Sequence, residues 1–516
     1  MRLNILIAGM AGQGINEISN ILSKSLASAG YYVFNYREYH SLITGGHNFN
    51  VLSLADTPIN SHEESYDIVI ALANDIEIYK KNIKKNAIIL ASCDYCKNIV
   101  KINVENKKVE NVYYAAALFK ILGLDKEILK RYIERKFKGK SLYEDDLKAL
   151  AAYDVDYKIN LGLEKGKEEN YIITGAEACG IAAIEAGLQV YLAYPMTPAT
   201  SLLSFLANNQ RKYDYLVYQP ESEISVVNQA LGASFAGAIS MIGTSGGGFD
   251  LMTEALSMSG MTELPIVFYL ASRPGPSTGL PTYSMQSDIK VALNAGHGEF
   301  SRVVVCPGDV ESAFRLTKEA FYLAEKFKIP SIILTDKNLA ESSFTIKNLD
   351  KYKINMPKPG KILGRDLVRT NSYEHDVCGN TLEEPLEIKK RFDYRLEKRE
   401  AIKKEVARMR TYSVYGNKNA KKVIISTGSN KGAILDSLQS LDIKFIQINY
   451  LEPFADIAKE VKGREIYVLE TNSTGMLADL IEKNLFIKID KKHRILKYNS
   501  KPFMASDIIS ILGRGR

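Results

Sequence analysis

The chain has 516 residues, of which 46% are apolar and 25% charged, and its net charge is +7. This composition is typical of a globular protein with several domains, and the scattered lysines form no basic stripe that would favour nucleic-acid binding. No apolar stretch reaches the roughly 18 residues that span a bilayer, and the N-terminal apolar run has no signal-peptide features. We therefore expect a cytoplasmic protein that binds neither membrane nor nucleic acid.

The five cysteines provide neither a disulfide framework nor the ligand set of an iron–sulfur cluster. Cys93 and Cys96 have the spacing of a redox pair, but the chain has no second such pair. Their role stays open, and we assign no metal ligand to this chain.

Short apolar runs alternate with helical patterns along the whole chain. The runs are almost continuously apolar, which is typical of strands covered on both faces. The alternation predicts an α/β fold built from parallel sheets and βαβ units. The predicted strands are NILIAGM, DIVIALA, AIILAS, QVYLAYP, AISMIGTS, PIVFYLAS, RVVVCP, PSIILTD, KVIISTGS and EIYVLET.

The pattern divides the chain into three α/β domains, at residues 1–160, 170–345 and 421–516. A charged linker follows the first domain. A loop-like stretch and a long charged helix, together 346–420, connect the second domain to the third.

A glycine turn, GMAGQGI at 9–15, follows the first predicted strand and opens a helix. The N–H groups of such a turn favour an anion. However, the spacing G-x-x-G-x-G differs from the dinucleotide pattern G-x-G-x-x-G, and the position about 20 residues further on offers Arg37 and Glu38 rather than a clean acidic residue at a strand end. We favour a packing turn and keep nucleotide binding as an alternative. The small-residue stretch 44–47, which ends in His47, is a candidate neighbour of this turn.

We expect four features of the second domain to lie at the ends of strands. They are the motif AYPMTPATS, an acidic helix start at Glu221 and Glu223, a glycine-rich stretch at 243–254 that we expect to be a flexible loop, and the segment 272–288. The carboxyl ends of parallel strands form one ligand-binding edge. We therefore expect these features to meet in one crevice.

Together these motifs resemble the α subunit of the 2-oxoacid:ferredoxin oxidoreductases. YPMTP at 194–198 is similar to the family motif Tyr-Pro-Ile-Thr-Pro, with methionine for isoleucine. GMAGQG resembles the glycine turn of the family's γ subunit, and YEHDVCGN, STGSNKGAI and LETNSTGML resemble further α-subunit stretches. The resemblance covers nearly the whole chain in the order γ then α. It implies a γ-type domain, a pyrimidine-type thiamine-diphosphate-binding domain and a transketolase C-terminal-like domain.

The resemblance also implies site residues. Glu223, with Glu221 as the fallback, would hold a proton against the cofactor's pyrimidine ring, because burial disfavours a charged carboxylate. Arg273 would bind the substrate carboxylate in a bidentate way, and Thr197 and Thr282 would donate hydroxyl groups to the substrate. The remaining cofactor-binding candidates are Tyr194, Pro195, Met196, Pro198, Gly246, Gly247 and Gly248.

The sequence lacks the Gly-Asp-Gly segment that holds Mg²⁺ and the diphosphate in thiamine enzymes. The resemblance implies that a separate β subunit carries that half-site and a [4Fe–4S] cluster, in a heterodimer or a dimer of heterodimers. The expected reaction is CoA-dependent oxidative decarboxylation of a 2-oxoacid to acyl-CoA and CO₂, with reduction of ferredoxin. The preferred 2-oxoacid and any contact of the γ-type domain with CoA stay open.

Three alternatives remain at this point. The chain could be a thiamine-dependent transferase or dehydrogenase component without iron–sulfur chemistry, a nucleotide-binding protein, or a non-catalytic scaffold. The third domain's GSNKG turn at 428–432 fits either an anion site or a packing loop.

Overall fold

The computed structural model describes residues 2–40, 46–73, 75–92, 99–159, 161–162, 168–349, 352–357 and 369–513. Thr44, Gly45, Cys93 and Cys96 lie outside the described residues. The chain forms two compact units. Unit 1 comprises 1–173, 342–348 and 504–510, and unit 2 comprises the remainder. Within the described ranges, no helix is both long and apolar enough to cross a membrane.

Unit 1 is built on an eight-stranded sheet with the order β6-β5-β4-β1-β3-β2-β14-β7. Apolar side chains of β1 and of the helices α1 to α4 form one buried cluster against this sheet. The strands are β1 (Arg2–Met10), β2 (Tyr32–Glu38), β3 (His47–Ala55), β4 (Tyr66–Ala71), β5 (Ile83–Ala91), β6 (Ile99–Lys101), β7 (Tyr171–Thr174) and β14 (Ser343–Ile346). The helices are α1 (Ile15–Ser28), α2 (Glu110–Ile121), α3 (Lys126–Phe137), α4 (Tyr143–Ala149) and the start of α17 (Ala505–Leu512).

The sheet of unit 1 is mixed, so the expectation of parallel sheets was wrong here. Strand β1 pairs parallel to β4 but antiparallel to β3. The sequence HNFNVLSLA of β3 was missed because polar residues interrupt its apolar run. The structure satisfies these polar groups inside the sheet: buried Ser53 donates to Asn4 Oδ1 at 2.8 Å. Buried polar side chains that bond to one another are compatible with a strand covered on both faces.

Unit 2 contains two sheets that share one apolar core cluster. The seven-stranded sheet has the order β18-β12-β13-β11-β10-β8-β9, and all its pairings except β12 with β18 are parallel. Its strands are β8 (Val190–Ala193), β9 (Leu216–Tyr218), β10 (Ser240–Thr244), β11 (Ile266–Ser272), β12 (Val303–Val305), β13 (Pro330–Asp336) and β18 (Tyr450–Glu452). The five-stranded sheet comprises β15 (Tyr412–Gly416), β16 (Lys422–Thr427), β17 (Lys444–Ile448), β19 (Glu465–Glu470) and β20 (Arg494–Leu496).

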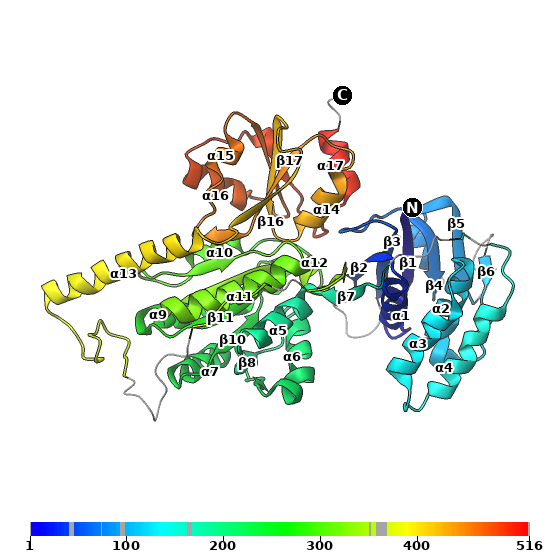
Figure 1. Ribbon diagram of the computed structural model, residues 1–516, viewed down its shortest axis with the longest axis horizontal. Coiled ribbons are helices and arrows are strands. Elements are labelled where there is room, and N and C mark those ends of the chain that lie inside the picture. The colour runs from blue at the N-terminus through cyan, green and yellow to red at the C-terminus, as the bar shows by residue number, and fades with distance from the viewer. Residues whose placement is uncertain are drawn as a thin grey trace. The chain divides into compact units, whose positions relative to one another are not determined.

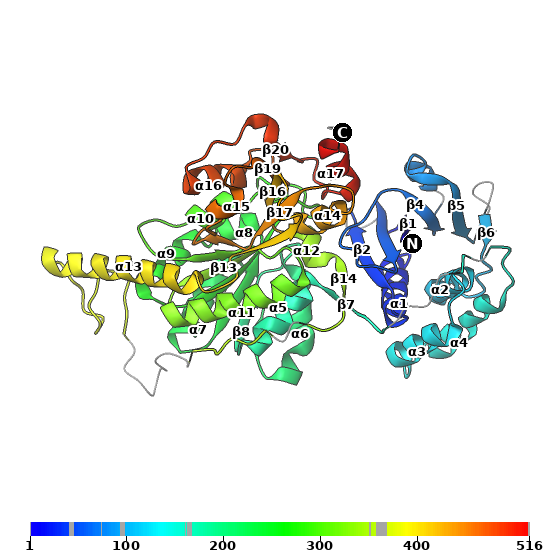
Figure 2. The ribbon, with the colours of Figure 1, turned by 45° about the horizontal axis from the view of Figure 1, so that its top comes forward.

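Helices cover the sheets of unit 2 (Figure 1). They are α5 (Gly175–Glu185), α6 (Thr200–Tyr213), α7 (Glu223–Phe235), α8 (Gly246–Asp250), α9 (Thr253–Thr262), α10 (Ile289–Asn294), α11 (Val310–Phe327), α12 (Lys337–Glu341), α13 (Pro385–Val406), α14 (Asn430–Ser437), α15 (Ala458–Val461) and α16 (Met476–Leu485). The predicted charged helix is α13, which projects away from both sheets of unit 2 (Figures 1 and 2).

All ten predicted strands are present, and so is the expected α/β class. The division into domains at 1–160, 170–345 and 421–516 stays a prediction, because compactness alone separates the chain into only two units.

Candidate active site

Four polar segments leave the seven-stranded sheet at one edge. Strands β11, β10, β8 and β9 are neighbours and run parallel, with Gly243 of β10 opposite Ala193 of β8. Because the strands are parallel, the residues that follow them lie on the same edge of the sheet. The structure thus brings together the four features that the sequence pointed to.

Arg273 directly follows β11 and is 8% exposed. Its Nη1 donates to the main-chain carbonyl of Thr197 at 2.7 Å, and its own carbonyl accepts a hydrogen bond from Ser287 Oγ at 2.7 Å. We expected the segments of Thr197 and Arg273 to meet in one crevice, and the structure joins the two residues directly. Burial lowers the pKa of the guanidinium, and the charges of Asp288 and Glu223 oppose that change.

Glu223 is the first residue of α7 and is 5% exposed, whereas Glu221 is exposed. The helix is capped by Ser222, whose hydroxyl accepts from the N–H of Ser225 at 3.3 Å. The cap therefore does not depend on either acid. Of the two glutamates, the structure buries only the one we preferred.

The glycine-rich stretch after β10 forms the short helix α8, so the expectation of a flexible loop was wrong. Glycine disfavours a helix, but burial overrides its weak propensity here. Phe249 and Met252 are fully buried, and the ring of Phe249 packs on Phe268 with centroids 5.7 Å apart. A Cβ atom added at Gly248 would lie 2.8 Å from Cγ and Oε1 of Glu223 and closer still to Thr244 Oγ1, so the absence of a side chain at this position makes room for both residues.

Several buried polar atoms at this edge make no hydrogen bond to any described residue. They are Ser245 Oγ, Arg273 Nε, Thr282 Oγ1 and Asp288 Oδ2. Most buried polar groups in folded proteins have a partner, so a cluster of unpaired ones indicates a polar ligand. Our sequence reasoning chose Thr282 and Arg273 but missed Ser245 and Asp288. Asp288 precedes α10 and has the sequence context of an ordinary helix cap, yet its side chain makes no cap hydrogen bond.

The motif YPMTP is only partly buried. Tyr194 and Pro195 are exposed, Met196 and Thr197 are half-buried, and Pro198 is buried. The sulfur of Met196 lies 4.0 Å from Thr244 Oγ1, at the end of β10. The second half of the motif therefore faces the other site segments.

The glycine turn of unit 1 is held by the side chain of one of its own residues, Gln13. Gln13 accepts from the N–H of Met10 at 2.6 Å and donates to the carbonyl of Leu72 at 3.2 Å. Gly12 and Gly14 have φ of 91° and 79°, which glycine adopts without strain. This geometry favours the packing turn. His47, at the start of β3, is half-buried and packs on Tyr79 with ring centroids 5.0 Å apart.

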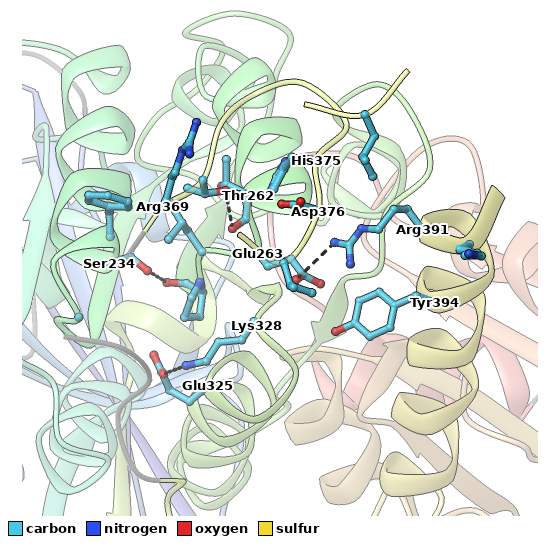
Figure 3. A pocket seen from close by; sticks show the side chains of 18 of the residues that line it. Ser234, Thr262, Glu263, Glu325, Lys328, Arg369, His375, Asp376, Arg391 and Tyr394 are labelled. Carbon is cyan, nitrogen blue, oxygen red and sulfur yellow. Dashed lines mark hydrogen bonds and ion pairs between the residues drawn. The ribbon is translucent and has the colours of Figure 1, made fainter. Parts of the chain in front are cut away.

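Two further resemblance motifs lie elsewhere in unit 2. His375 and Asp376 of YEHDVCGN line a cavity of about 690 Å³, which also includes residues preceding β10 and β11, at the opposite edge of the sheet (Figure 3). Lys431 of GSNKG is buried and forms an ion pair with Asp309. Because its only charged side chain is already paired, this turn fits the packing role rather than an anion site.

Two family models match the chain. The model described as "Pyruvate flavodoxin/ferredoxin oxidoreductase, thiamine diP-bdg" matches residues 181–411, and "Pyruvate ferredoxin/flavodoxin oxidoreductase" matches 4–153. The 2-oxoacid:ferredoxin oxidoreductase subunit alpha of Saccharolobus solfataricus is 30% identical over 98% of this chain and 97% of its own length. This chain belongs to the 2-oxoacid:ferredoxin oxidoreductase family.

Other relatives agree with this assignment. The 2-oxoglutarate synthase subunit KorA of Archaeoglobus fulgidus is 39% identical over 33% of this chain and 49% of its own length. The 2-oxoglutarate:ferredoxin oxidoreductase of Magnetococcus marinus has a TM-score of 0.87 and 25% identity, covering 99% of both chains. That structure contains 2-oxoglutarate, coenzyme A and succinyl-CoA.

The part of this chain that matches the family's thiamine-diphosphate-binding model includes Thr197, Glu223 and Arg273. The site fits half of such a cofactor: a buried acid lies beside a glycine helix, among buried polar atoms that lack partners.

Proposed function

We propose that this chain is the α-type subunit, with a fused γ-type domain, of an enzyme that converts a 2-oxoacid and CoA to acyl-CoA and CO₂ and reduces ferredoxin. Within a domain that matches the family's thiamine-binding model, Thr197, Glu223 and Arg273 lie at one sheet edge, and this convergence carries the proposal. The family membership supports the same reaction.

Glu223 is the residue we assign to the cofactor. Thiamine diphosphate, when bound, supplies the carbon nucleophile and electron sink that decarboxylation of a 2-oxoacid needs. In its protonated form Glu223 would donate a hydrogen bond to the pyrimidine ring, and this bond would favour the tautomer in which the nitrogen group on the ring acts as a base. The backbone of Gly246 to Gly248 would approach the ring closely, since no side chain intervenes.

Arg273 and the two threonines are the residues we assign to the substrate. The Arg273 guanidinium binds the carboxylate of the 2-oxoacid, and the carbonyl of Thr197 fixes the orientation of that guanidinium. The unpaired hydroxyl of buried Thr282 donates to the substrate. Both threonine hydroxyls are neutral, so they hold the substrate without competing for the proton at Glu223.

A β subunit must complete this site, because the chain contains no diphosphate-binding Gly-Asp-Gly segment. We assign Mg²⁺, the diphosphate site and a [4Fe–4S] cluster to that partner, in a heterodimer or a dimer of heterodimers that passes electrons to ferredoxin. The bound molecules of the Magnetococcus marinus enzyme make 2-oxoglutarate the first substrate to test.

Co-purification with the β subunit tests the proposal. We expect CoA-dependent reduction of a viologen dye with 2-oxoglutarate, pyruvate, or a branched-chain or aryl 2-oxoacid. No reduction with any of these acids would refute it. A β subunit without a cluster would favour the transferase alternative. Saturable NAD or NADP binding that is lost on Gly12→Val would favour the nucleotide-binding alternative.

A further inference from the structure

Gln286 lies in the segment between Arg273 and α10, and it is 6% exposed. Its Nε2 donates to Asp336 Oδ2 and to the carbonyl of Thr427, both at 3.1 Å. Its Oε1 accepts from Asn430 Nδ2 at 2.9 Å, and its main-chain N–H donates to the carbonyl of Thr471 at 2.8 Å. Thr427, Asn430 and Thr471 belong to the block at 421–516, so this one residue ties the segment to that block.

The bonding pattern allows only one orientation of the Gln286 amide. If the amide were flipped, its NH₂ would face the NH₂ of Asn430 and its oxygen would face the carboxylate of Asp336. Asn430 is itself held, because its Oδ1 accepts from Thr471 Oγ1 at 2.9 Å. A fully satisfied buried network specifies a single arrangement, since each unmade bond would leave a polar group without water.

Ser287, the next residue, connects this network to the candidate site through two hydrogen bonds. Ser287 donates from its N–H to Ser272 Oγ at 3.2 Å and from its Oγ to the Arg273 carbonyl at 2.7 Å. The other side of the segment is held as well, because the N–H of Ser284 donates to the carbonyl of Ser500 at 3.2 Å. A shift of Gln286 would therefore move the backbone of Arg273 and of the nearby Thr282.

We propose that Gln286 is a positioning residue, through which the block at 421–516 holds Arg273 and Thr282 in the geometry that binds the 2-oxoacid. This inference rests on the proposed function. It gives the block a part in substrate binding, although none of the site residues assigned above belongs to it. A binding group must be held to within about half an ångström to be effective, and a loop reaches such precision only through supporting contacts.

The test uses the complex with its β subunit and the variant Gln286→Leu. We expect KM for the 2-oxoacid to rise about tenfold, while kcat changes less than threefold and KM for CoA does not change, because ground-state and transition-state binding are lost together. Gln447→Leu is the matched control: Gln447 is fully buried in the same block and donates to the Gly428 carbonyl at 3.3 Å. This control should lower thermal stability and leave KM for the 2-oxoacid unchanged.

A reciprocal exchange adds a rescue test. Gln286→Glu places a second carboxylate opposite the carboxylate of Asp336. Adding Asp336→Asn supplies a side-chain N–H at position 336 that can donate to the new carboxylate at position 286. We expect the single variant to raise KM further than Gln286→Leu does and the double variant to recover at least part of the loss. Equal KM values in the single and double variants would contradict a role for this contact.

Hydrogen exchange separates this inference from the proposed function. Gln286→Leu should speed amide exchange across 272–288 in the assembled complex, whatever reaction the complex catalyses. Unchanged exchange there, or a KM within twofold of the wild-type value in an active complex, would overturn the inference. If the wild-type complex reduces no dye with any 2-oxoacid, the proposed function fails, and the exchange experiment still decides whether Gln286 holds the segment.

Discussion

The guanidinium of Arg273 donates a hydrogen bond to the main-chain carbonyl of Thr197 at 2.7 Å, across a sequence separation of 76 residues. The two residues follow β11 and β8, which are not adjacent, because β10 lies between them. The bond therefore passes over the end of β10, where α8 begins. One donor of the guanidinium is used for orientation, and the others stay available for a ligand.

Replacing Arg273 by lysine should weaken substrate binding. Lysine keeps the charge but cannot bond the Thr197 carbonyl and also bind a carboxylate with two parallel hydrogen bonds. Losing a charge-assisted bond costs about 1.5–3 kcal/mol, so KM for the 2-oxoacid should rise about 10- to 100-fold. Steady-state kinetics of the complex would measure this. Arg302→Lys is the control, since Arg302 donates to the carbonyls of Ala292 and Ala295, and it should leave KM unchanged.

Glu223→Gln should abolish most activity without unfolding the chain. The substitution keeps the size of the side chain and removes its ionisable carboxyl proton, so kcat should fall by about 10²-fold or more. The melting temperature should stay near the wild-type value. Glu221→Gln, at the exposed neighbour, should change kcat less than twofold. A large loss from the Glu221 variant instead would move the assignment to that residue.

Gly248→Ala should disturb Glu223, whereas Gly247→Ala should not. The added Cβ at 248 would lie 2.8 Å from Glu223 Oε1 and closer still to Thr244 Oγ1, but at 247 it would meet only the Ser277 carbonyl, at 3.6 Å from its oxygen. Overpacking of this kind costs about 1–3 kcal/mol. Activity and the stability measured by urea unfolding should both be lower in the first variant and nearly normal in the second. Equal behaviour of the two would show that both Glu223 and Thr244 can move aside.

Glu319→Ala should destabilise unit 2 strongly. Glu319 is 1% exposed, pairs with Arg315 at 2.9 Å and accepts from the Tyr450 hydroxyl at 2.6 Å. Removing it leaves a buried guanidinium without a counter-charge, at a cost of about 3–5 kcal/mol. Asp393→Ala breaks the exposed pair with Lys389 and should cost no more than about 1 kcal/mol. Urea denaturation distinguishes the two, and similar losses would contradict the burial argument.

Asp146→Asn should stabilise the protein at neutral pH but not in acid. Burial, with added repulsion from Asp145 and Glu17, raises the pKa of Asp146 to about 6. The native state therefore binds this proton more tightly than the unfolded state, and stability falls as pH rises from about 4 to 6. Asparagine avoids the buried charge. The gain in melting temperature should appear over that interval and stay constant above it, and a gain independent of pH would exclude this cause.

The sequence predicted the parts of unit 2 that depend on continuous apolar runs. Strands such as PIVFYLAS are buried on both faces, so the apolar pattern alone identifies them and places the site segments at their ends. Short strands at the sheet edges, such as β9 and β18, have too few residues to show a pattern. The antiparallel pairing of β3 escaped prediction because its polar residues find their partners only in the folded sheet.

The candidate site could be predicted only where a residue belongs to a recognised motif. Glu223 and Arg273 lie in such motifs. Asp288 and Gln286 lie in the same segment as Arg273, but no sequence pattern singles them out, because their importance depends on contacts with residues far away in the sequence. The bond from Arg273 to the Thr197 backbone could not be foreseen either, because sequence patterns assign roles to side chains and not to particular carbonyl groups.

The strand β18 comes from the block at 421–516, yet it pairs antiparallel with β12 at the margin of the seven-stranded sheet. A chain shortened after residue 420 would therefore lose more than its last block. The backbone groups of β12 would become an open edge, which invites association with other chains. For recombinant work, the boundary suggested by the sequence is consequently a poor place to cut, and the thiamine-binding half should be expressed together with its C-terminal block.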